Sequence, residues 1–286
     1  MKLTGRKVFN FFNIAFMLFL IAITAYPFYY VVIASFSDPV KLSSHSGILL
    51  VPLKPYEFGA YEAVFSHPLL ISGFLNTLFL VVVGTFMNLF FTALGAFFLS
   101  QKGPMFKNVI VTMVIITMYF YGGLVPNYIL IKNLGLYNTR MALILPGLIN
   151  AVHMIILKTA FQSIPESLTE SALLDGGSYF QILLRIMIPL SKATLAVLVL
   201  YHVIGYWNEW FQASIYLRDK NKYPIQLAVR NLLEEDTALK GDAVMTRYAQ
   251  LMKYAIIVVV SSPIVILYPY LTKYFEKGVM MGSVKS

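Results

Sequence analysis

Long apolar runs separated by short polar segments dominate the chain. Six runs are each long enough for a helix to cross a lipid bilayer, which takes roughly 20 apolar residues. They cover residues 8–36, 70–99, 106–131, 141–161, 188–216 and 251–275. Lipid offers no hydrogen-bond partners to an open strand, so each run is predicted to be a helix. The pattern therefore predicts an all-α polytopic membrane protein with six transmembrane helices.

Some runs contain helix-breaking residues. Gly122, Gly123 and Pro126 interrupt the third run, and Pro263 lies in the sixth. Neighbouring helices can satisfy the backbone groups that such breaks free. The first run is longer than the apolar core of a signal peptide and no A-x-A-like site ends it, which disfavours a cleavable leader.

Composition agrees with this membrane assignment. Of 286 residues, 58% are hydrophobic and only 12% are charged, against about 25% charged in a typical soluble domain. That balance excludes a soluble enzyme, a disordered chain and a nucleic-acid-binding module. The chain has no cysteine, which excludes disulfides, zinc–thiolate sites and thiol catalysis. No clustered His, Asp and Glu spacing predicts another metal site.

The charged residues bear on orientation and on mechanism. The net charge is +9, but Lys and Arg divide evenly between the two sides. The basic flank of the first run, with Lys2, Arg6 and Lys7, favours a cytoplasmic N-terminus and hence a cytoplasmic C-terminus. No Asp or Glu occurs between Glu62 and Glu166. This disfavours an ion-coupled carrier, which commonly needs a carboxylate within the membrane.

The segment between the fourth and fifth runs, residues 163–181, carries strong helix-boundary signals. Ser163 and Glu166 have the spacing of a capping box, with Pro165 predicted in the first helical turn. A glycine pair at 176–177 predicts the end of this helix. Ser178 and Gln181 predict a second capping box. Two short helices are therefore expected. They either dock onto a partner protein or form a plain connecting helix pair.

The same segment resembles the "EAA" loop of ABC-importer permeases. The matching residues are Glu170-Ser171-Ala172, then Gly176, then residues 186–189, which end in Pro189. Ser171 stands where the family has Ala, and Ile188 where it has Leu. Further stretches resemble the carbohydrate-uptake branch, similar to the smaller permease of the maltose importer and to permeases for polysaccharide fragments. They are Trp207-Asn208-Glu209, Tyr223 to Gln226, Pro263 with Tyr268 and Tyr270, and Lys273 to Gly278 with Gly282 and Lys285.

The resemblance implies one permease domain over residues 1–286, in the bacterial cell membrane, with a cytoplasmic coupling loop at about 163–187. Its implied partners are a second, different permease subunit, two copies of an ATPase subunit, an extracytoplasmic solute-binding protein, membrane lipid and a sugar substrate. ATP and Mg would bind the ATPase, so this chain would hold no cofactor and no catalytic residue. No G-x-x-x-x-G-K-[ST] motif occurs in it, and no nucleic-acid partner is expected.

Candidate coupling residues follow from the loop. The resemblance implies contacts with the ATPase for Glu170, Ala172 and Gly176, and the neighbouring apolar side chains are inferred to fill its groove. Pro189 would fix the direction of the fifth span. The full set is Glu170, Ser171, Ala172, Leu173, Leu174, Asp175, Gly176, Tyr179, Phe180 and Pro189.

Polar residues within the spans are candidates for a sugar path, because polar groups in lipid are costly and face a cavity or another helix. The candidates are Asn150, His153, His202, Trp207, Asn208, Glu209 and Trp210. Interhelical hydrogen bonds and an interfacial aromatic belt are the structural alternatives. The path could also lie mainly in the partner permease.

Two polar segments, residues 38–67 and 218–247, are expected outside the cell. The second has apolar residues at helical spacing, which predicts a short surface helix. These segments would dock the binding protein, or be simple solvated loops. A secondary carrier or channel is the main alternative function, and an integral membrane enzyme is disfavoured because no catalytic cluster occurs at one membrane face.

Overall fold

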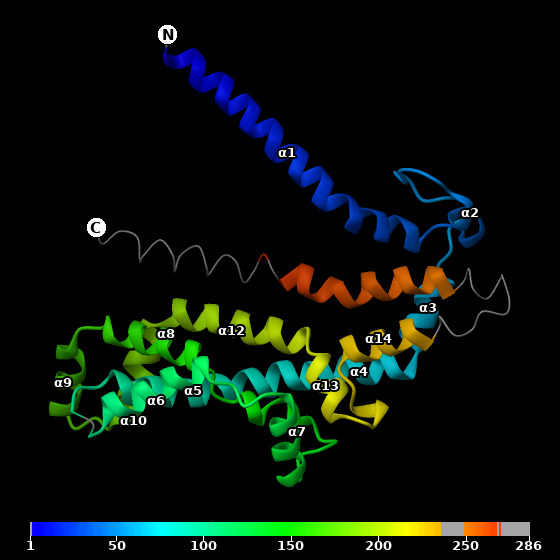
Figure 1. Ribbon diagram of the computed structural model, residues 1–286. Coiled ribbons are helices and arrows are strands. Elements are labelled where there is room, and N and C mark those ends of the chain that lie inside the picture. Colours follow the sequence, from blue (N-terminus) through cyan, green and yellow to red (C-terminus); the bar gives the residue numbers. More distant parts are fainter. Residues whose placement is uncertain (1, 104, 236–248, 268, 270–286) are drawn as a thin grey trace. The chain divides into compact units, whose positions relative to one another are not determined.

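A computed structural model describes residues 2–103, 105–235, 249–267 and 269. This described part is helical and has no strand, which confirms the all-α prediction (Figure 1). The chain divides into two compact units, Met1–Pro68 with Val229–Pro263, and Leu69–Ala228 with Ile264–Ser286. The C-terminal residues for which the sequence predicts a family resemblance, including Lys273, Gly282 and Lys285, lie outside the described residues.

The first unit contains the first apolar run. Helix α1 spans Lys2–Ser35, and α2 spans Pro39–Ser44, where the Asp38 carboxylate accepts the backbone N–H of Lys41 at 2.8 Å. Helix α3 spans Gly59–Ser66. Phe, Leu and Ile side chains are exposed along most of α1. Such a surface is suited to lipid or to another apolar protein surface.

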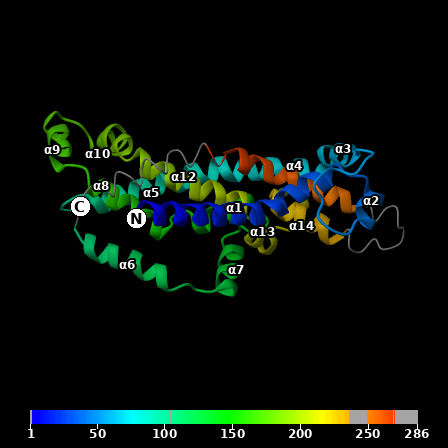
Figure 2. The same cartoon turned by 90° about the horizontal axis from the view of Figure 1, so that it is seen from above.

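The second unit is built on one long rod. Helix α4, Pro68–Phe79, continues through a π-helical segment, Leu80–Gly84, into α5, Thr85–Ser100. Figures 1 and 2 show α5 beside α8, Ala151–Gln162, and both lie alongside α12, which begins at Lys192. Their buried side chains form one core together with those of the helical segment Tyr179–Leu190. It contains Ala93, Ala96, Phe97, Leu99, Met154, Leu157, Phe161, Ile182, Leu183, Met187 and Leu198.

Three described helices are long and apolar enough to cross a membrane by themselves: Arg6–Ser35, Pro68–Ser100 and Ala249–Leu267. They correspond to the first, second and sixth predicted spans. The other three predicted spans are bent pairs. The third consists of α6, Lys107–Tyr119, and α7, Leu124–Asn133, with a bend of 116° between them.

The fourth predicted span is a short 3-10 stretch, Arg140–Gly147, bent by 51° against α8. The fifth consists of Tyr179–Leu190 and α12, Lys192–Trp207, bent by 85°. The sequence prediction of one continuous helix over residues 188–216 is therefore wrong in its boundaries. Helix α12 ends at Trp207, and a separate helix α13 spans Phe211–Tyr216.

Glycine explains one of these bends, and proline accounts for an irregular helical turn before another. Gly123 has a φ of +90°, which the other residues rarely adopt, and it directly precedes α7. Pro189 lies two residues after the π-helical segment Leu183–Met187, which precedes the bend at Ser191. Proline lacks the N–H that would continue the helical ladder, and its ring crowds the preceding turn.

The short surface helix expected in the second outer segment is present as α14, Ile225–Glu235. Two adjacent polar side chains of α4 hold the chain that leads into it. The Asn76 side-chain amide donates to the carbonyls of Asn221, at 2.7 Å, and Tyr223, at 3.0 Å. The Thr77 hydroxyl accepts the Ile225 N–H at 2.8 Å. These buried polar groups of the second run are thus used to anchor a loop.

Candidate functional site

The predicted helix at the start of the EAA-like loop is present as α9, Glu166–Leu174. Its predicted capping box between Ser163 and Glu166 is wrong. Helix α8 continues to Gln162, so Ser163 terminates that helix and its hydroxyl donates to the Ala160 carbonyl at 2.7 Å. Pro165 then occupies the N-cap position of α9 instead of its first turn.

The glycine pair ends α9 as the sequence predicts. Gly176 has a φ of +82°, its N–H donates to the Leu173 carbonyl at 3.0 Å, and the Gly177 N–H donates to the Ala172 carbonyl at 2.8 Å. This is the Schellman pattern, which satisfies the last carbonyls of a helix. A Cβ atom on Gly177 would lie 2.7 Å from the Ala172 oxygen. Gly176 is therefore required by its positive φ, and Gly177 by the lack of space for a side chain.

The second predicted capping box is confirmed. The Ser178 hydroxyl accepts the Gln181 N–H at 3.3 Å, and the Gln181 side chain accepts the Ser178 N–H at 2.9 Å. Helix α10 begins there, at Tyr179, and the helical path continues as far as Leu190. Two helices with defined ends therefore meet at a glycine corner.

Most candidate coupling residues are on the surface. Leu174 is 89% exposed, and Glu170 and Gly176 are also exposed. Ala172 is the exception, because it is half-buried against the core of the second unit. The exposed set is Glu170, Ser171, Leu173, Leu174, Asp175, Gly176, Tyr179, Phe180 and Pro189. Ala172 thus positions α9 on its own subunit, while its neighbours form an exposed surface.

An ion pair that the sequence did not predict fixes the start of α9. The ammonium of Lys102, just after α5, donates to the Glu166 carboxylate. This hydrogen bond and the negative charge of Glu166 raise the pKa of Lys102. The two residues are 64 positions apart, so only the fold brings them together.

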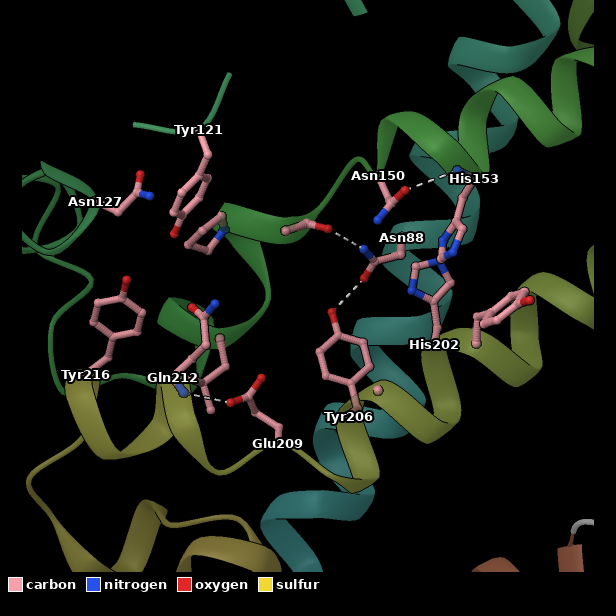
Figure 3. Close-up of a pocket in the computed structure, with 15 residues that line it drawn as sticks. Asn88, Tyr121, Asn127, Asn150, His153, His202, Tyr206, Glu209, Gln212 and Tyr216 are labelled. Atoms are coloured by element: carbon pink, nitrogen blue, oxygen red, sulfur yellow. Dashed lines mark hydrogen bonds between the residues drawn. The ribbon is translucent and has the colours of Figure 1, made fainter. Parts of the chain in front are cut away.

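A polar cavity of ≈ 460 Å³ lies elsewhere in the second unit, between α5, α8, α12 and α13 (Figure 3). Amide and phenol side chains provide most of its polar lining. The lining residues are Asn88, Tyr121, Asn127, Leu143, Pro146, Gly147, Asn150, His153, Tyr201, His202, Gly205, Tyr206, Glu209, Gln212 and Tyr216.

Four predicted path residues line this cavity: Asn150, His153, His202 and Glu209. The remaining three do not. Trp207 is buried, with its ring centroid 5.9 Å from that of Phe74. The Asn208 side chain donates to the Ile204 carbonyl at 3.0 Å, and Trp210 makes an edge contact with the ring of Phe211.

This division follows from the unexpected end of α12, which turns successive side chains of residues 207–210 in different directions. Sequence reasoning also missed Tyr121, Asn127 and Gln212. They come from a loop, α7 and α13, and no motif connects them. Only their meeting around one cavity identifies them.

The two histidines bond to each other across the helices. His153 Nδ1 and His202 Nε2 are 3.1 Å apart, and the His153 ring stacks on Tyr201 with centroids 5.4 Å apart. The Asn150 side-chain oxygen Oδ1 accepts the backbone N–H of His153 at 3.1 Å and caps α8. This is the interhelical hydrogen bonding that was the structural alternative for these residues. Within the described ranges, no three His, Asp or Glu side chains gather as a metal site.

A second network links α12 to the rod. The Tyr206 hydroxyl donates to Asn88 Oδ1 at 2.6 Å, and Asn88 Nδ2 donates to the carbonyls of Gly147, at 2.7 Å, and Leu148, at 3.1 Å. Figure 3 shows the Tyr206–Asn88 bond on the cavity wall. Gly84 lies under the Tyr206 ring, where a Cβ would approach within 2.5 Å. The network holds the bend between the 3-10 stretch and α8.

Glu209 lies two residues before α13. Its carboxylate Oε1 accepts the Gln212 N–H at 2.9 Å, as Figure 3 shows. Glu209 and Gln212 therefore form one corner of the cavity, and none of the described lining residues is Lys or Arg.

Known proteins resemble this chain over nearly its whole length, although no protein-family model matches it. Protein LplC of Bacillus subtilis is 39% identical, covering 98% of this chain and 95% of its own. The polygalacturonan/rhamnogalacturonan transport system permease protein YtcP of Bacillus subtilis is 35% identical, covering 98% and 99%. The inner membrane ABC transporter permease protein YcjP of Escherichia coli is 30% identical, covering 94% and 93%.

A solved structure agrees with these relatives. A chain in the crystal structure of a bacterial ABC transporter involved in the import of the acidic polysaccharide alginate superposes with a TM-score of 0.87 and 28% identity, covering 95% of this chain and 98% of that one. Together with the long apolar helices, this identifies a multi-pass protein of the bacterial membrane. The chain belongs to the family of ABC transport-system permeases that includes the permeases for oligosaccharides.

Proposed function

We propose that the chain is one of two permease subunits of an ATP-driven importer for oligosaccharides. Its partners would be a second permease, two ATPase subunits and an extracytoplasmic binding protein. The related permeases for arabinooligosaccharides and galactooligosaccharides support the substrate class. ATP and Mg would bind the ATPase subunits, so this chain contributes no cofactor site.

The exposed helix α9 is the observation that carries this proposal. A nine-residue helix is marginal in isolation, yet the Gly176 corner fixes the end of α9 and the exposed Lys102–Glu166 ion pair links its start to the end of α5. Leu174, at 89% exposure, projects an apolar side chain from it. A rigid surface helix with apolar contacts suits docking into a groove of a partner that drives conformational change. We assign α9 as the coupling helix.

We further propose six spans with both termini in the cytoplasm. Three continuous helices and three bent pairs would account for them. Bent helices inside a membrane are stable where other helices or a wet cavity cover the freed backbone groups. The cavity on α12 and α13 adjoins such a break.

The cavity would form this subunit's part of the sugar path. Sugars are recognised by hydrogen bonds to their hydroxyl groups and by contact with aromatic rings. Asn127, Asn150 and Gln212 provide amides, and Tyr121 and Tyr216 provide rings with hydroxyls. We therefore assign substrate contact to Asn150 and Glu209 among the sequence candidates, and not to Trp207 or Asn208.

The proposal is tested in proteoliposomes that contain both permeases and the ATPase, with the binding protein added outside the vesicles. Labelled oligosaccharides should accumulate only when ATP, ATPase and binding protein are all present. Uptake by this chain alone, or uptake driven by an ion gradient, would instead establish a secondary carrier or channel.

A variant pair tests the coupling helix separately. Glu170→Lys should reduce co-purification of the ATPase and abolish uptake, because it reverses an exposed charge on α9. Glu62→Lys, an identical charge reversal at an exposed site on α3, should retain the ATPase. Equal retention of the ATPase by both variants would refute the assignment of α9.

A further inference from the structure

The described residues that line the cavity include an acidic side chain but no Lys or Arg. Among the described residues that line it, Glu209 is the one carboxylate and there is no Lys or Arg. The other polar lining groups are amides, phenols and the two histidines, which already bond to each other at 3.1 Å. The cavity therefore offers many neutral hydrogen-bonding groups and no permanent positive charge.

The neutral groups are arranged to contact a polyol. Figure 3 shows Tyr121, Asn127 and Tyr216 on one side of the cavity and Asn150 with the histidines on the other, with Gln212 and Glu209 between them. An amide provides both donors and acceptors, and a phenol provides one donor, an acceptor and an apolar ring face. Sugar hydroxyls likewise donate and accept, so they can pair with such a lining without any ionic contact.

An anionic sugar would meet a different energy balance. A uronate carboxylate that leaves water is strongly disfavoured unless a cation or several hydrogen-bond donors replace its hydration. None of the described lining residues supplies a guanidinium or ammonium, so only neutral amide and phenol donors could replace the hydration of the uronate, and the Glu209 carboxylate would repel its negative charge. A neutral oligosaccharide of the same length carries neither penalty.

We propose that this permease's cavity selects uncharged oligosaccharides and discriminates against acidic ones. The inference rests on the proposed function, because it specifies which sugars pass the same cavity. Glu209 and Gln212 set the selectivity. Glu209 supplies the repelling carboxylate, and Gln212 occupies the neighbouring position where a cation would attract a uronate.

The test uses two probes that share one skeleton, trigalacturonate and its fully methyl-esterified form. Saturation-transfer NMR measures the affinity of each for the purified complex of both permeases and the ATPase, without the binding protein, whose own specificity would otherwise filter the sugars. The neutral ester should bind at least about tenfold more tightly than the acid, which is the effect expected if only one of the three carboxylates of trigalacturonate is left uncompensated at intermediate dielectric.

Two variants should lower the ratio of the ester's affinity to the acid's affinity. Gln212→Lys should lower the preference for the ester by about tenfold, since it places a cation beside the path. Glu209→Gln should lower it as well, while the amide oxygen can still accept the Gln212 N–H. Gln212→Asn keeps a neutral amide and should leave the ratio unchanged.

The inference is overturned if the acid binds as tightly as the ester in the unmodified complex, if Gln212→Lys leaves the ratio unchanged, or if neither probe binds. The vesicle assay distinguishes this from failure of the proposed function. ATP-dependent uptake of acidic oligosaccharides would overturn the charge selectivity alone. Absence of any ATP-dependent uptake, of neutral or acidic sugars, would overturn the importer function itself.

Discussion

Replacing Gly84 with alanine tests how tightly α12 packs on the long rod. A Cβ at this position would lie 2.5 Å from Tyr206 Cζ and 2.9 Å from its hydroxyl oxygen. Carbon atoms in contact normally lie about 3.5–4.0 Å apart, so the ring must move by about 1 Å. That movement stretches the 2.6 Å hydrogen bond from Tyr206 to Asn88.

The expected cost follows from these two effects. Overpacking against the Tyr206 ring costs about 1–3 kcal/mol, and the weakened hydrogen bond adds about 1 kcal/mol. The higher helix propensity of alanine returns about 1 kcal/mol. We therefore expect Gly84→Ala to lower the free energy of unfolding by about 1–3 kcal/mol.

Gly205→Ala is the matched control. Gly205 also lies in a helix, α12, at the wall of the polar cavity. A Cβ there would have no atom within 4 Å. This variant should be neutral or more stable by up to about 1 kcal/mol, from helix propensity alone.

Equilibrium unfolding of the purified protein in mixed micelles, followed by circular dichroism, compares the two variants. The substitution Tyr206→Ala removes the ring. When Gly84→Ala is added to that variant, it should lower the free energy of unfolding only slightly. Equal stability of the Gly84 and Gly205 variants, or an unchanged Gly84 cost without the ring, would refute the proposed packing.

Three further changes test other contacts. Asn76→Ala should cost about 1–3 kcal/mol in unfolding free energy, because it leaves two loop carbonyls without their donor; an unchanged stability would contradict this. Gly177→Ala should reduce ATPase co-purification, since its Cβ would lie 2.7 Å from the Ala172 oxygen and disturb the end of the coupling helix. Lys102→Glu should reduce uptake at low salt, and adding Glu166→Lys should restore it; failure of this rescue would show that the ion pair has no role. Because Glu166 raises the pKa of Lys102, the pair's contribution should persist at neutral pH and disappear as alkaline pH deprotonates the lysine.

The sequence alone determined the helical membrane character and the corner of the coupling loop. Lipid imposes a helix on any long apolar run, so the pattern of apolar positions is nearly sufficient. Local rules were equally sufficient where neighbouring residues interact, as in the capping box of Ser178 with Gln181 and the positive φ of Gly176. They failed at Ser163, because the length of α8 depends on packing and not on the cap itself.

The tertiary structure alone decided which polar residues share a cavity. Trp207, Asn208 and Glu209 are adjacent in sequence, yet only Glu209 lines it, because α12 ends within this triplet. Tyr121, Asn127 and Gln212 join it from distant segments. A sequence pattern records the apolar face that each helix needs. The bends that bring distant side chains together depend on contacts between helices, such as that of Asn88 with Tyr206, which no local pattern encodes.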